Sequence, residues 1–167
     1  FRSTDGLYNQ KYKYPPETIL SHSFFVQKPE EFYDFYRDKM IYTEAKPNKA
    51  HYALAGLEKQ GKLKAVITQN IDGLHQAAGS KSVYELHGTI MKNYCTRCGR
   101  EYPLSTIIES RGIPRCQVKD ETGGVSNGII KPKVVLYEEG LDDNVVSGAI
   151  KHIRNADMLI IGGTSLT

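Results

Sequence analysis

The alternation of hydrophobic and polar positions places two short apolar runs near the middle of the chain. Residues 65–68 and 82–86 are rich in β-branched side chains, and polar or turn-forming residues bound both runs. Runs this short do not form helices and suit strands buried on both faces of a parallel sheet. The polar stretch between them predicts a loop and a short helix, so a strand–loop–helix–strand pattern is expected here.

Three other segments repeat apolar residues at helical spacing. They are residues 29–40, 48–60 and 141–154. Pro29 suits the first turn of the first helix, and Asn48 is a favourable N-cap for the second. His51 lies inside the second helix, where a histidine is expected to be structural rather than catalytic.

Two segments predict other conformations. Residues 3–23 contain a Pro-Pro pair and an Asp-Gly pair, which favour turns and predict an irregular surface segment. Residues 156–161 form an apolar run that leads into a Gly-Gly pair, which predicts a strand followed by a glycine turn. Glycines in such a turn let the backbone approach a phosphate or ribose closely.

Composition and charge limit the class of protein. A chain of 167 residues with 40% hydrophobic residues can bury the core of one domain plus a small insert. The net charge of +3 is spread along the chain, without the basic stripe that a nucleic-acid partner requires. No apolar run approaches the roughly 18 residues of a membrane span. Three cysteines, an odd number, favour a reducing compartment, so a cytoplasmic protein without a membrane partner is expected.

Polar residues follow both predicted strands. Gln69, Asn70 and Asp72 come after the first strand, and His87 comes after the second. The carboxyl ends of parallel strands share one edge of a sheet, where α/β proteins bind ligands. The residues after the first strand are by themselves also compatible with a simple turn. His87 adds a side chain that can accept a proton near neutral pH, so this edge is the predicted reactive site.

The chain also carries a Cys-x-x-Cys pair, Cys95 and Cys98, which Cys116 follows. This spacing is that of half a zinc knuckle, in which a tight turn directs both thiolates at one metal. A redox pair is the alternative, but the surrounding sequence has no thioredoxin-like pattern. The cysteines therefore predict a small metal-binding module.

Several motifs occur in an order that is known from one family. They are TQNIDGLHQAAG at 68–79, ELHG at 85–88, FRS at 1–3, PNKAHYALAGLE at 47–58, CTRC at 95–98, KPKVVLYEE at 131–139 and GGTSLT at 162–167. The first two resemble the core signature of the sirtuins, the NAD-dependent protein lysine deacylases, and FRS resembles the end of that family's glycine-rich loop. The chain is thus similar to sirtuins of the bacterial type over nearly its whole length.

The resemblance implies an α/β fold, in which a Rossmann-like parallel sheet has helices on both faces and a small inserted zinc-ribbon-like module. Residues 1–90 and 128–167 would form the NAD-binding catalytic domain, and residues 91–127 the insert. The resemblance also implies truncation at both ends, because the glycine-rich loop would precede Phe1 and further parts of the NAD site would follow Thr167. A chain without these parts is expected to be inactive.

The resemblance further implies roles at the strand ends. His87 would be the general base acting on the ribose hydroxyls, Asn70 would orient the ribose and its water, and Asp72 would bind the nicotinamide carboxamide. The acyl oxygen would attack the ribose C1′ and expel nicotinamide, and the acyl group would leave as O-acyl-ADP-ribose. The residues expected to bind NAD are Phe1, Arg2, Gln69, Asn70, Ile71, Asp72, Gly163, Thr164 and Ser165.

The implied substrate is an acyl-lysine protein or peptide, which would add to the chain as a strand. The residues expected to bind it are Val135, Leu136, Tyr137, Glu138 and Tyr36. The family usually ends this segment in Phe-Gly-Glu, so Glu138 stands in place of the glycine. Sirtuins that prefer acidic acyl groups carry Tyr-x-x-Arg where this chain has Tyr36 and Lys39, so acetyl or another short neutral acyl group is predicted.

The metal site departs most from the family pattern. The family completes it with a fourth cysteine, which falls on Ser126. The implied ligands are Cys95, Cys98 and Cys116, and the candidates for the fourth position are Ser126, Asp120 and Glu121. Because serine is a poor zinc ligand, the sequence predicts a weakened structural zinc site that is partly occupied or metal-free.

Two alternatives stay open at this level. An ADP-ribosyltransferase would use the same NAD site but would pass ADP-ribose to a protein side chain. A non-catalytic zinc-knuckle binding module would bind no NAD at all. His87 and the turn at 70–72 favour an enzyme over the binding module, but they do not separate the two NAD reactions.

Overall fold

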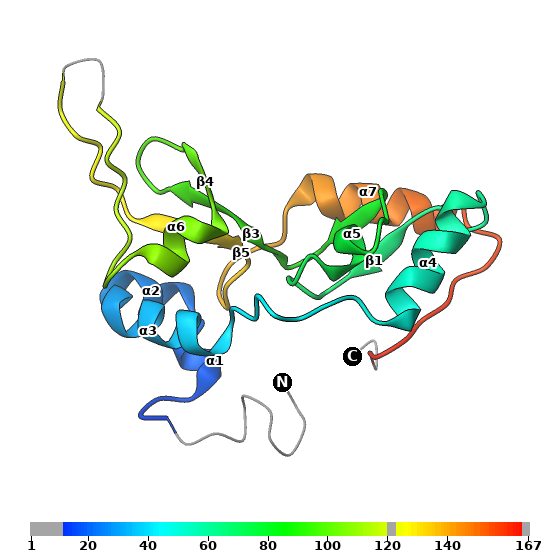
Figure 1. Ribbon diagram of the computed structural model, residues 1–167, viewed down its shortest axis with the longest axis horizontal. Coiled ribbons are helices and arrows are strands. Elements are labelled where there is room, and N and C mark those ends of the chain that lie inside the picture. Colours follow the sequence, from blue (N-terminus) through cyan, green and yellow to red (C-terminus); the bar gives the residue numbers. More distant parts are fainter. Residues whose placement is uncertain (1–11, 120–122, 165–167) are drawn as a thin grey trace. The chain divides into compact units, whose positions relative to one another are not determined.

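The computed structural model describes residues 12–119 and 123–164, which fold into two compact units (Figure 1). The first unit draws on Phe1–Ala45, Asn70–Gly73 and His87–Gly140. The second unit draws on Lys46–Gln69, Leu74–Leu86 and Leu141–Thr167. The backbone therefore passes from one unit to the other several times, and two of these passages fall at the predicted reactive residues.

Two short helices, α1 (Pro16–Ile19) and α2 (His22–Gln27), open the described part of the first unit. They correct the expectation of an irregular segment up to residue 23, of which residues 3–11 lie outside the described ranges. A proline occupies the first position of α1, where its fixed φ angle suits a helix and its missing N–H has no partner to lose. Ser21 caps α2, because its Oγ accepts a hydrogen bond from the Phe24 amide at 3.2 Å.

The predicted helix at 29–40 is confirmed as α3 (Pro29–Lys39), which supplies much of the core of the first unit. Its buried aromatic residues are Phe32, Tyr33, Phe35 and Tyr36. Phe32 and Tyr36 stack with ring centroids 5.5 Å apart. The Tyr33 hydroxyl donates a hydrogen bond to the Ile130 carbonyl at 2.6 Å, which ties the helix to a strand.

The first unit contains an antiparallel sheet of three strands in the order β4-β3-β5, and helix α6 (Leu104–Glu109) packs against it. The strands are β3 (Gly88–Cys95), β4 (Glu101–Pro103) and β5 (Ile130–Val134). Strand β5, which follows residue 128, joins this sheet by pairing antiparallel with β3. The eight-residue β3 offers hydrogen-bonding groups on both edges, and β5 takes one edge while β4 takes the other.

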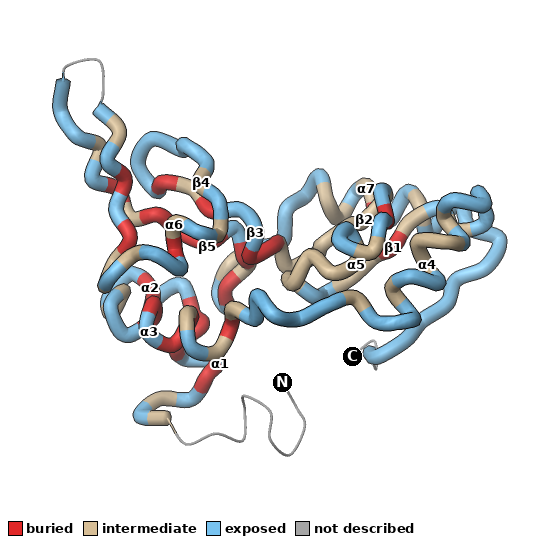
Figure 2. Tube along the Cα trace, in the orientation of Figure 1, coloured by how far each residue is buried: buried red, intermediate tan, exposed pale blue. Residues whose placement is uncertain are grey.

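Buried residues gather on α1–α3 and on β3 and β5 (Figure 2). The cluster includes Ile19 of α1, the aromatic face of α3, Ile90 of β3 and Ile130 of β5, and it also takes in Cys95 and Cys116. Burial of apolar area contributes about 25 cal/mol per Å². This shared core is therefore the main source of stability of the first unit.

The second unit confirms the predicted central pattern. Strand β1 (Val66–Thr68) pairs in parallel with β2 (Val83–Glu85), and helix α5 (Leu74–Ala77) lies between them in the sequence. Helices α4 (Lys49–Lys59) and α7 (Asp143–Arg154) confirm the two other amphipathic predictions. The expected parallel sheet with helices is thus present. Within the described ranges, no helix is long and apolar enough to cross a membrane.

Helix α4 begins with a reciprocal cap. The Asn48 side chain accepts hydrogen bonds from the amides of Ala50 and His51 at 3.0 and 3.2 Å. The His51 ring accepts one in return from the Asn48 amide, through Nδ1 at 3.2 Å. This capping box satisfies backbone donors that a helix start leaves without partners. His51 is therefore structural, as the sequence predicts.

The apolar run at 156–161 is not a strand. Its residues are irregular and exposed, with Met158 at 78% and Ile160 at 80%. A strand persists only where a neighbouring strand takes its backbone hydrogen bonds. None of the strands formed by the described residues pairs with this run, so its β-branched composition alone does not produce a strand.

Candidate functional site

His87 lies at a constrained point, directly before β3. Its carbonyl accepts a hydrogen bond from the Val135 amide at 2.9 Å. The next residue, Gly88, has a φ of +75°, and a Cβ added to it would lie 2.1 Å from the Lys133 carbonyl oxygen. Only glycine fits so close an approach. His87 is therefore held, half-buried, beside the segment that begins at Val135.

The loop that follows β1 is attached to the same strand. The Ile71 carbonyl accepts a hydrogen bond from the Ile90 amide of β3 at 3.0 Å, and the Ile71 side chain packs against the core. Asn70 and Asp72 flank this anchored residue, the first exposed and the second half-buried. Backbone contacts with β3 thus fix the loop in the same unit as His87.

These three polar side chains suit a nucleotide ligand by their chemistry. The Asn70 amide can both donate to and accept from ribose hydroxyls, and the Asp72 carboxylate can accept from a carboxamide N–H. The His87 imidazole has a ring nitrogen that can serve as a general base. The first unit thus contains all three residues of the predicted catalytic set, and their individual roles stay predictions.

The remaining residues of the predicted NAD site belong elsewhere. Gln69, Gly163 and Thr164 are part of the second unit. Gly163, within the predicted glycine turn, has a φ of +72°, a conformation that favours glycine. A left-handed glycine next to a hydroxyl residue is compatible with a ribose or phosphate ligand. The predicted NAD residues outside the described ranges are Phe1, Arg2 and Ser165.

The segment predicted to bind substrate continues from β5 and is attached to the start of α2. The Tyr137 amide donates a hydrogen bond to the Leu20 carbonyl at 3.0 Å. The His22 amide donates one to the Tyr137 carbonyl, also at 3.0 Å. Leu136 is buried, whereas the Tyr137 side chain is 48% exposed. Successive side chains therefore face the core and the solvent, as in a strand.

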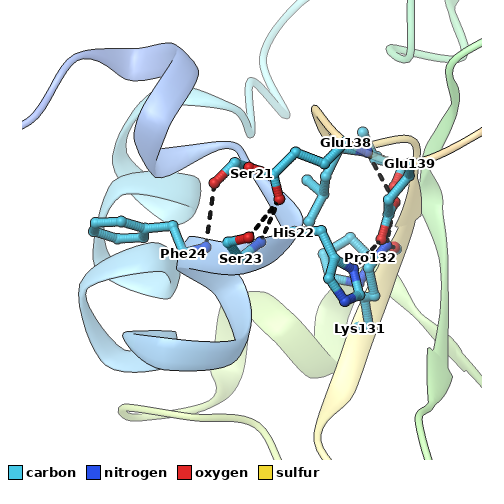
Figure 3. Close-up of polar contacts among 10 residues, drawn as sticks. Ser21, His22, Ser23, Phe24, Lys131, Pro132, Glu138 and Glu139 are labelled. Carbon is cyan, nitrogen blue, oxygen red and sulfur yellow. Dashed lines mark hydrogen bonds and ion pairs between the residues drawn. The ribbon is translucent and has the colours of Figure 1, made fainter.

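Glu138 combines an unusual backbone with two side-chain hydrogen bonds. Its φ of +74° lies in the left-handed region that favours glycine, the residue that the sirtuin pattern has at this place. Its carboxylate accepts from the Ser23 amide at 2.9 Å and from the Ser23 hydroxyl at 2.6 Å (Figure 3). These two bonds hold the pKa of Glu138 below its ordinary value. The departure from the family motif was the only sequence signal for this feature.

A buried ion pair lies next to this segment, and sequence reasoning missed it. Lys131 is 5% exposed, and its Nζ donates to the Glu139 carboxylate at 3.0 Å and to the Val134 carbonyl at 3.1 Å. The Glu139 carboxylate also contacts His22 Nδ1 at 2.8 Å and accepts from the Leu136 amide at 2.9 Å (Figure 3). A lysine within an apolar strand was the available signal, because a buried charge needs a partner.

Burial and pairing shift the two charges in opposite ways. Burial lowers the pKa of Lys131, and the ion pair with Glu139 opposes this effect without cancelling it. Burial raises the pKa of Glu139, but hydrogen bonds from Leu136, His22 and Lys131 outweigh burial and hold that pKa below its ordinary value. The Glu139 carboxylate is therefore ionised at neutral pH.

Tyr36 and Lys39, predicted near the acyl group, have different surroundings. Tyr36 is completely buried, and its hydroxyl has no hydrogen-bond partner among the described residues. Burial raises the pKa of this hydroxyl, so it is neutral. Lys39 forms an ion pair with Asp38 at 3.0 Å. The role of Tyr36 in substrate binding stays a prediction.

The three cysteines come together, as their spacing predicts. The Sγ atoms of Cys95, Cys98 and Cys116 all lie within 4.8 Å of one another, and those of Cys98 and Cys116 are 3.7 Å apart. The amides of Arg97 and Cys98 each donate to Cys95 Sγ at 3.4 Å. Three converging thiols with amide donors behind them fit a zinc ion by ligand type and by geometry.

Polar neighbours favour the thiolate form, which binds zinc. Burial raises the pKa of the Cys95 thiol, but hydrogen bonds from Ser126 and from backbone amides outweigh it and lower that pKa to about 6. Burial also raises the pKa of Cys116, which the Tyr102 hydroxyl, 3.0 Å from Sγ, helps to lower below its ordinary value. The same hydrogen bond contributes most to raising the pKa of Tyr102, to about 12.

Of the three candidates for a fourth ligand, the structure describes one. Ser126 Oγ lies 3.4 Å from Cys95 Sγ. Asp120 and Glu121 lie outside the described residues. All three cysteines and Ser126 fall within residues 91–127, the predicted insert, whose boundaries stay a prediction.

Known proteins resemble this chain closely. A protein named NAD-dependent protein deacetylase from Clostridium acetobutylicum is 58% identical over 169 residues, which cover 99% of this chain and 66% of the relative. A structure from work on sirtuin substrate affinity matches with a TM-score of 0.85 and 39% identity, over 99% of this chain and 65% of that one. A Sir2 variant with a deacetylated p53 peptide and 3′-O-acetyl ADP ribose matches with a TM-score of 0.76 and 41% identity, over 90% and 58%.

The chain spans less than two thirds of the length of these proteins, and the three matches cover 90–99% of its own sequence. The family model described as Sir2 covers residues 1–167. This agrees with the sirtuin-like motifs in the sequence and with the Rossmann-like fold of the matching structures. Sequence, fold and family model lead to one assignment: the chain belongs to the Sir2 family.

Proposed function

We propose that this protein is an NAD-dependent protein lysine deacylase, which removes short acyl groups from lysine and releases nicotinamide and O-acyl-ADP-ribose. One observation carries the proposal. The His87 carbonyl accepts a hydrogen bond from the Val135 amide, so a residue that can act as a general base lies beside the start of the segment expected to bind substrate. The relative from Clostridium, which carries the name deacetylase, supports it. The Sir2 complex with a deacetylated peptide and an acetylated ADP-ribose supports the reaction class.

NAD, when bound, supplies a ribose hydroxyl that accepts the acyl group and a nicotinamide that leaves. The proposed NAD-binding residues are Phe1, Arg2, Gln69, Asn70, Ile71, Asp72, Gly163, Thr164 and Ser165. The Asp72 carboxylate accepts a hydrogen bond from the carboxamide, and the Asn70 side chain orients the ribose and its water. His87 takes the proton from the ribose hydroxyl. Because the Ile71 loop and His87 are both anchored to the first unit, little reordering is needed to place these groups.

The acyl-lysine peptide is proposed to bind along the segment from Val135 to Glu138. The amides of Val135, Leu136 and Tyr137 already donate hydrogen bonds within the chain. We therefore assign main-chain pairing with the peptide to the Glu138 end of the segment. The exposed Tyr137 and the half-buried Val135 are assigned to side-chain contacts with the acyl-lysine.

The test uses the protein in its longest natural form with an acetyl-lysine peptide and NAD, and it measures nicotinamide release and loss of the acetyl group. His87→Ala is expected to lower turnover by about 100-fold or more, since a general base contributes roughly 10²–10⁴. His152→Ala is the matched control, because His152 lies on α7, outside the predicted site. Its turnover is expected to match that of the unchanged protein.

Two outcomes would contradict the proposal. Equal turnover in His87→Ala and in the unchanged protein would show that His87 is not the general base of the reaction. Transfer of label from NAD to a protein side chain, with the acyl groups left in place, would indicate an ADP-ribosyltransferase.

We also predict that acetyl-lysine peptides are turned over faster than succinyl-lysine peptides. A succinyl carboxylate in an apolar site needs a cationic partner, because an unpaired buried charge is costly. Lys39 is already paired with Asp38, and the Tyr36 hydroxyl is neutral. Steady-state kinetics on two peptides that differ only in the acyl group test this prediction. Faster turnover of the succinyl peptide would show that a cation reaches the acyl site.

A further inference from the structure

Three cysteines leave one corner of a tetrahedral zinc site to be filled. Among the described residues, the metal-ligating cluster at this place consists of Cys95, Cys98 and Cys116, without a histidine or a carboxylate. Two hydroxyl side chains of the described residues reach the cluster. They belong to Ser126, 3.4 Å from Cys95 Sγ, and to Tyr102, 3.0 Å from Cys116 Sγ.

Distances between ligand atoms distinguish the two hydroxyls. With Zn–S bonds of about 2.3 Å and Zn–O bonds of about 2.0 Å, a tetrahedron has S···S edges of about 3.8 Å and S···O edges of about 3.5 Å. The observed Cys98–Cys116 distance is 3.7 Å, and the Cys95–Ser126 distance is 3.4 Å. The Tyr102 contact of 3.0 Å is shorter than such an edge and is that of a hydrogen bond to sulfur. By this one S···O distance, Ser126 Oγ fits the fourth ligand position, whereas the Tyr102 hydroxyl fits a hydrogen-bond donor to a ligand sulfur.

The backbone around Ser126 is held in place from several sides. The Ser126 amide donates to the Val118 carbonyl at 2.8 Å, and the Arg97 guanidinium donates to the Ser126 carbonyl at 3.0 Å. Gly128 follows shortly after, and a Cβ added there would lie 2.5 Å from Cys95 Sγ. Glycine thus lets this loop pass directly against the sulfur. The half-buried Ser126 hydroxyl is positioned by its backbone and is not a freely moving surface group.

We propose that Ser126 supplies the fourth ligand of a zinc site made of three cysteine thiolates and one serine hydroxyl oxygen. A hydroxyl is a weaker zinc ligand than a thiolate, because zinc favours soft sulfur donors in structural sites. The site therefore holds zinc less tightly than a four-cysteine site does. It links the 95–98 turn to residues 116–119 and 125–128, which pair with each other in a strand-like way. This inference holds whatever reaction the protein catalyses.

The test compares zinc binding in the protein and in four variants. Zinc per chain is measured by elemental analysis, affinity by competition with a chromogenic chelator, and ligand type from the absorption of the cobalt-substituted protein. Ser126→Ala is expected to weaken zinc binding by about tenfold or more, because even the loss of an outer-shell partner typically costs roughly 10–100-fold in metal affinity. Ser126→Cys is expected to tighten binding and to add sulfur-to-cobalt charge-transfer intensity. Tyr102→Phe is expected to weaken binding less than Ser126→Ala, and Ser105→Ala is the control, because Ser105 is an exposed residue of α6.

Each result bears on the assignment. Unchanged affinity in Ser126→Ala, or no added charge-transfer intensity in Ser126→Cys, would overturn it. A larger loss of zinc affinity in Tyr102→Phe than in Ser126→Ala would show that Tyr102, and not Ser126, supplies the fourth ligand. Circular dichroism of every variant separates loss of a ligand from loss of the fold. Ser126→Cys keeps a side chain of similar size and is therefore expected to fold.

Discussion

At the scale of single residues, Glu138 combines an unfavourable backbone conformation with two hydrogen bonds that offset its free-energy cost. A φ of +74° brings Cβ close to the following carbonyl oxygen, so the conformation is unfavourable for any residue other than glycine. The two hydrogen bonds from Ser23 attach the same residue to the start of α2. The glycine of the family motif would avoid the strain but could not make these bonds.

We predict that Glu138→Ala unfolds at a lower urea concentration than both the unchanged protein and Glu138→Gly. Alanine loses the two bonds and keeps the strain, whereas glycine loses both the bonds and the strain. Ser23→Ala is the matched control, because it removes the hydroxyl bond and leaves the Ser23 amide bond and the strain in place. Urea unfolding followed by circular dichroism gives the order of the unfolding midpoints of these proteins. Coinciding midpoints for the alanine and glycine variants at 138 would mean that the conformation is not strained.

At the scale of elements, the ion pair of Lys131 and Glu139 holds the end of β5 against the turn that follows it and against α2. Lys131 belongs to the strand, Glu139 lies beyond it, and His22 begins the helix. The Glu139 carboxylate receives contacts from all of these parts and from the Leu136 amide. The conformation of the proposed substrate segment therefore depends on one ionised carboxylate.

This arrangement predicts a pH dependence of stability. The pKa of Glu139 is lower in the folded protein than its ordinary value of 4.5. Its contribution is therefore fully present above about pH 4.5 and is lost as the pH falls through the folded-state pKa. Glu139→Gln is expected to lower stability at pH 7 by about 1–3 kcal/mol, because Lys131 loses its charged partner. It is also expected to lose less stability than the unchanged protein below pH 4.5.

Urea unfolding at pH 7, 5 and 3.5 measures both effects. The other carboxyl groups titrate in both proteins, so the difference between the two curves isolates Glu139. Parallel losses of stability in the two proteins below pH 4.5 would show that the ionised carboxylate does not support the fold.

At the scale of the whole molecule, the two units differ in how many of their apolar side chains are buried. The core cluster of described residues runs from Ile19 to Leu136 and lies entirely in the first unit. In the second unit, α4 has no buried residue and α7 has Ala149 alone. Several of its apolar side chains are exposed, among them Leu57, Ile150 and Ile153. Apolar burial is the main stabilising term, so the second unit of this chain is the less stable one.

We predict that backbone amides of α4 and α7 exchange with solvent deuterium faster than those of α3 and β3. Local opening costs less where fewer apolar contacts are lost. Hydrogen exchange followed by mass spectrometry of peptides from each element tests this, and α3 serves as the internal reference because it has the same length as α4. Equal protection of α3 and α4 would show that the second unit is stabilised by something other than its own buried area.

The sequence by itself determined the features that depend on neighbours a few residues away. Asn48 starts a helix because its side chain caps nearby amides, and Cys95 and Cys98 share a turn because two residues separate them. The two β-branched runs formed parallel strands, and the polar residues at 70–72 and 87 were found from their places after these strands. These signals are local or periodic, so they can be read from one chain.

The tertiary structure decided what depends on partners far away in the sequence. It paired β5 with β3, left 156–161 without a neighbouring strand, and placed Ser126 beside Cys95, 31 positions away. It also brought His22 to the carboxylate of Glu139, 117 positions away. Pairing, burial and ligand geometry arise only when distant segments meet, because backbone hydrogen bonds and buried charges must find partners wherever the fold supplies them.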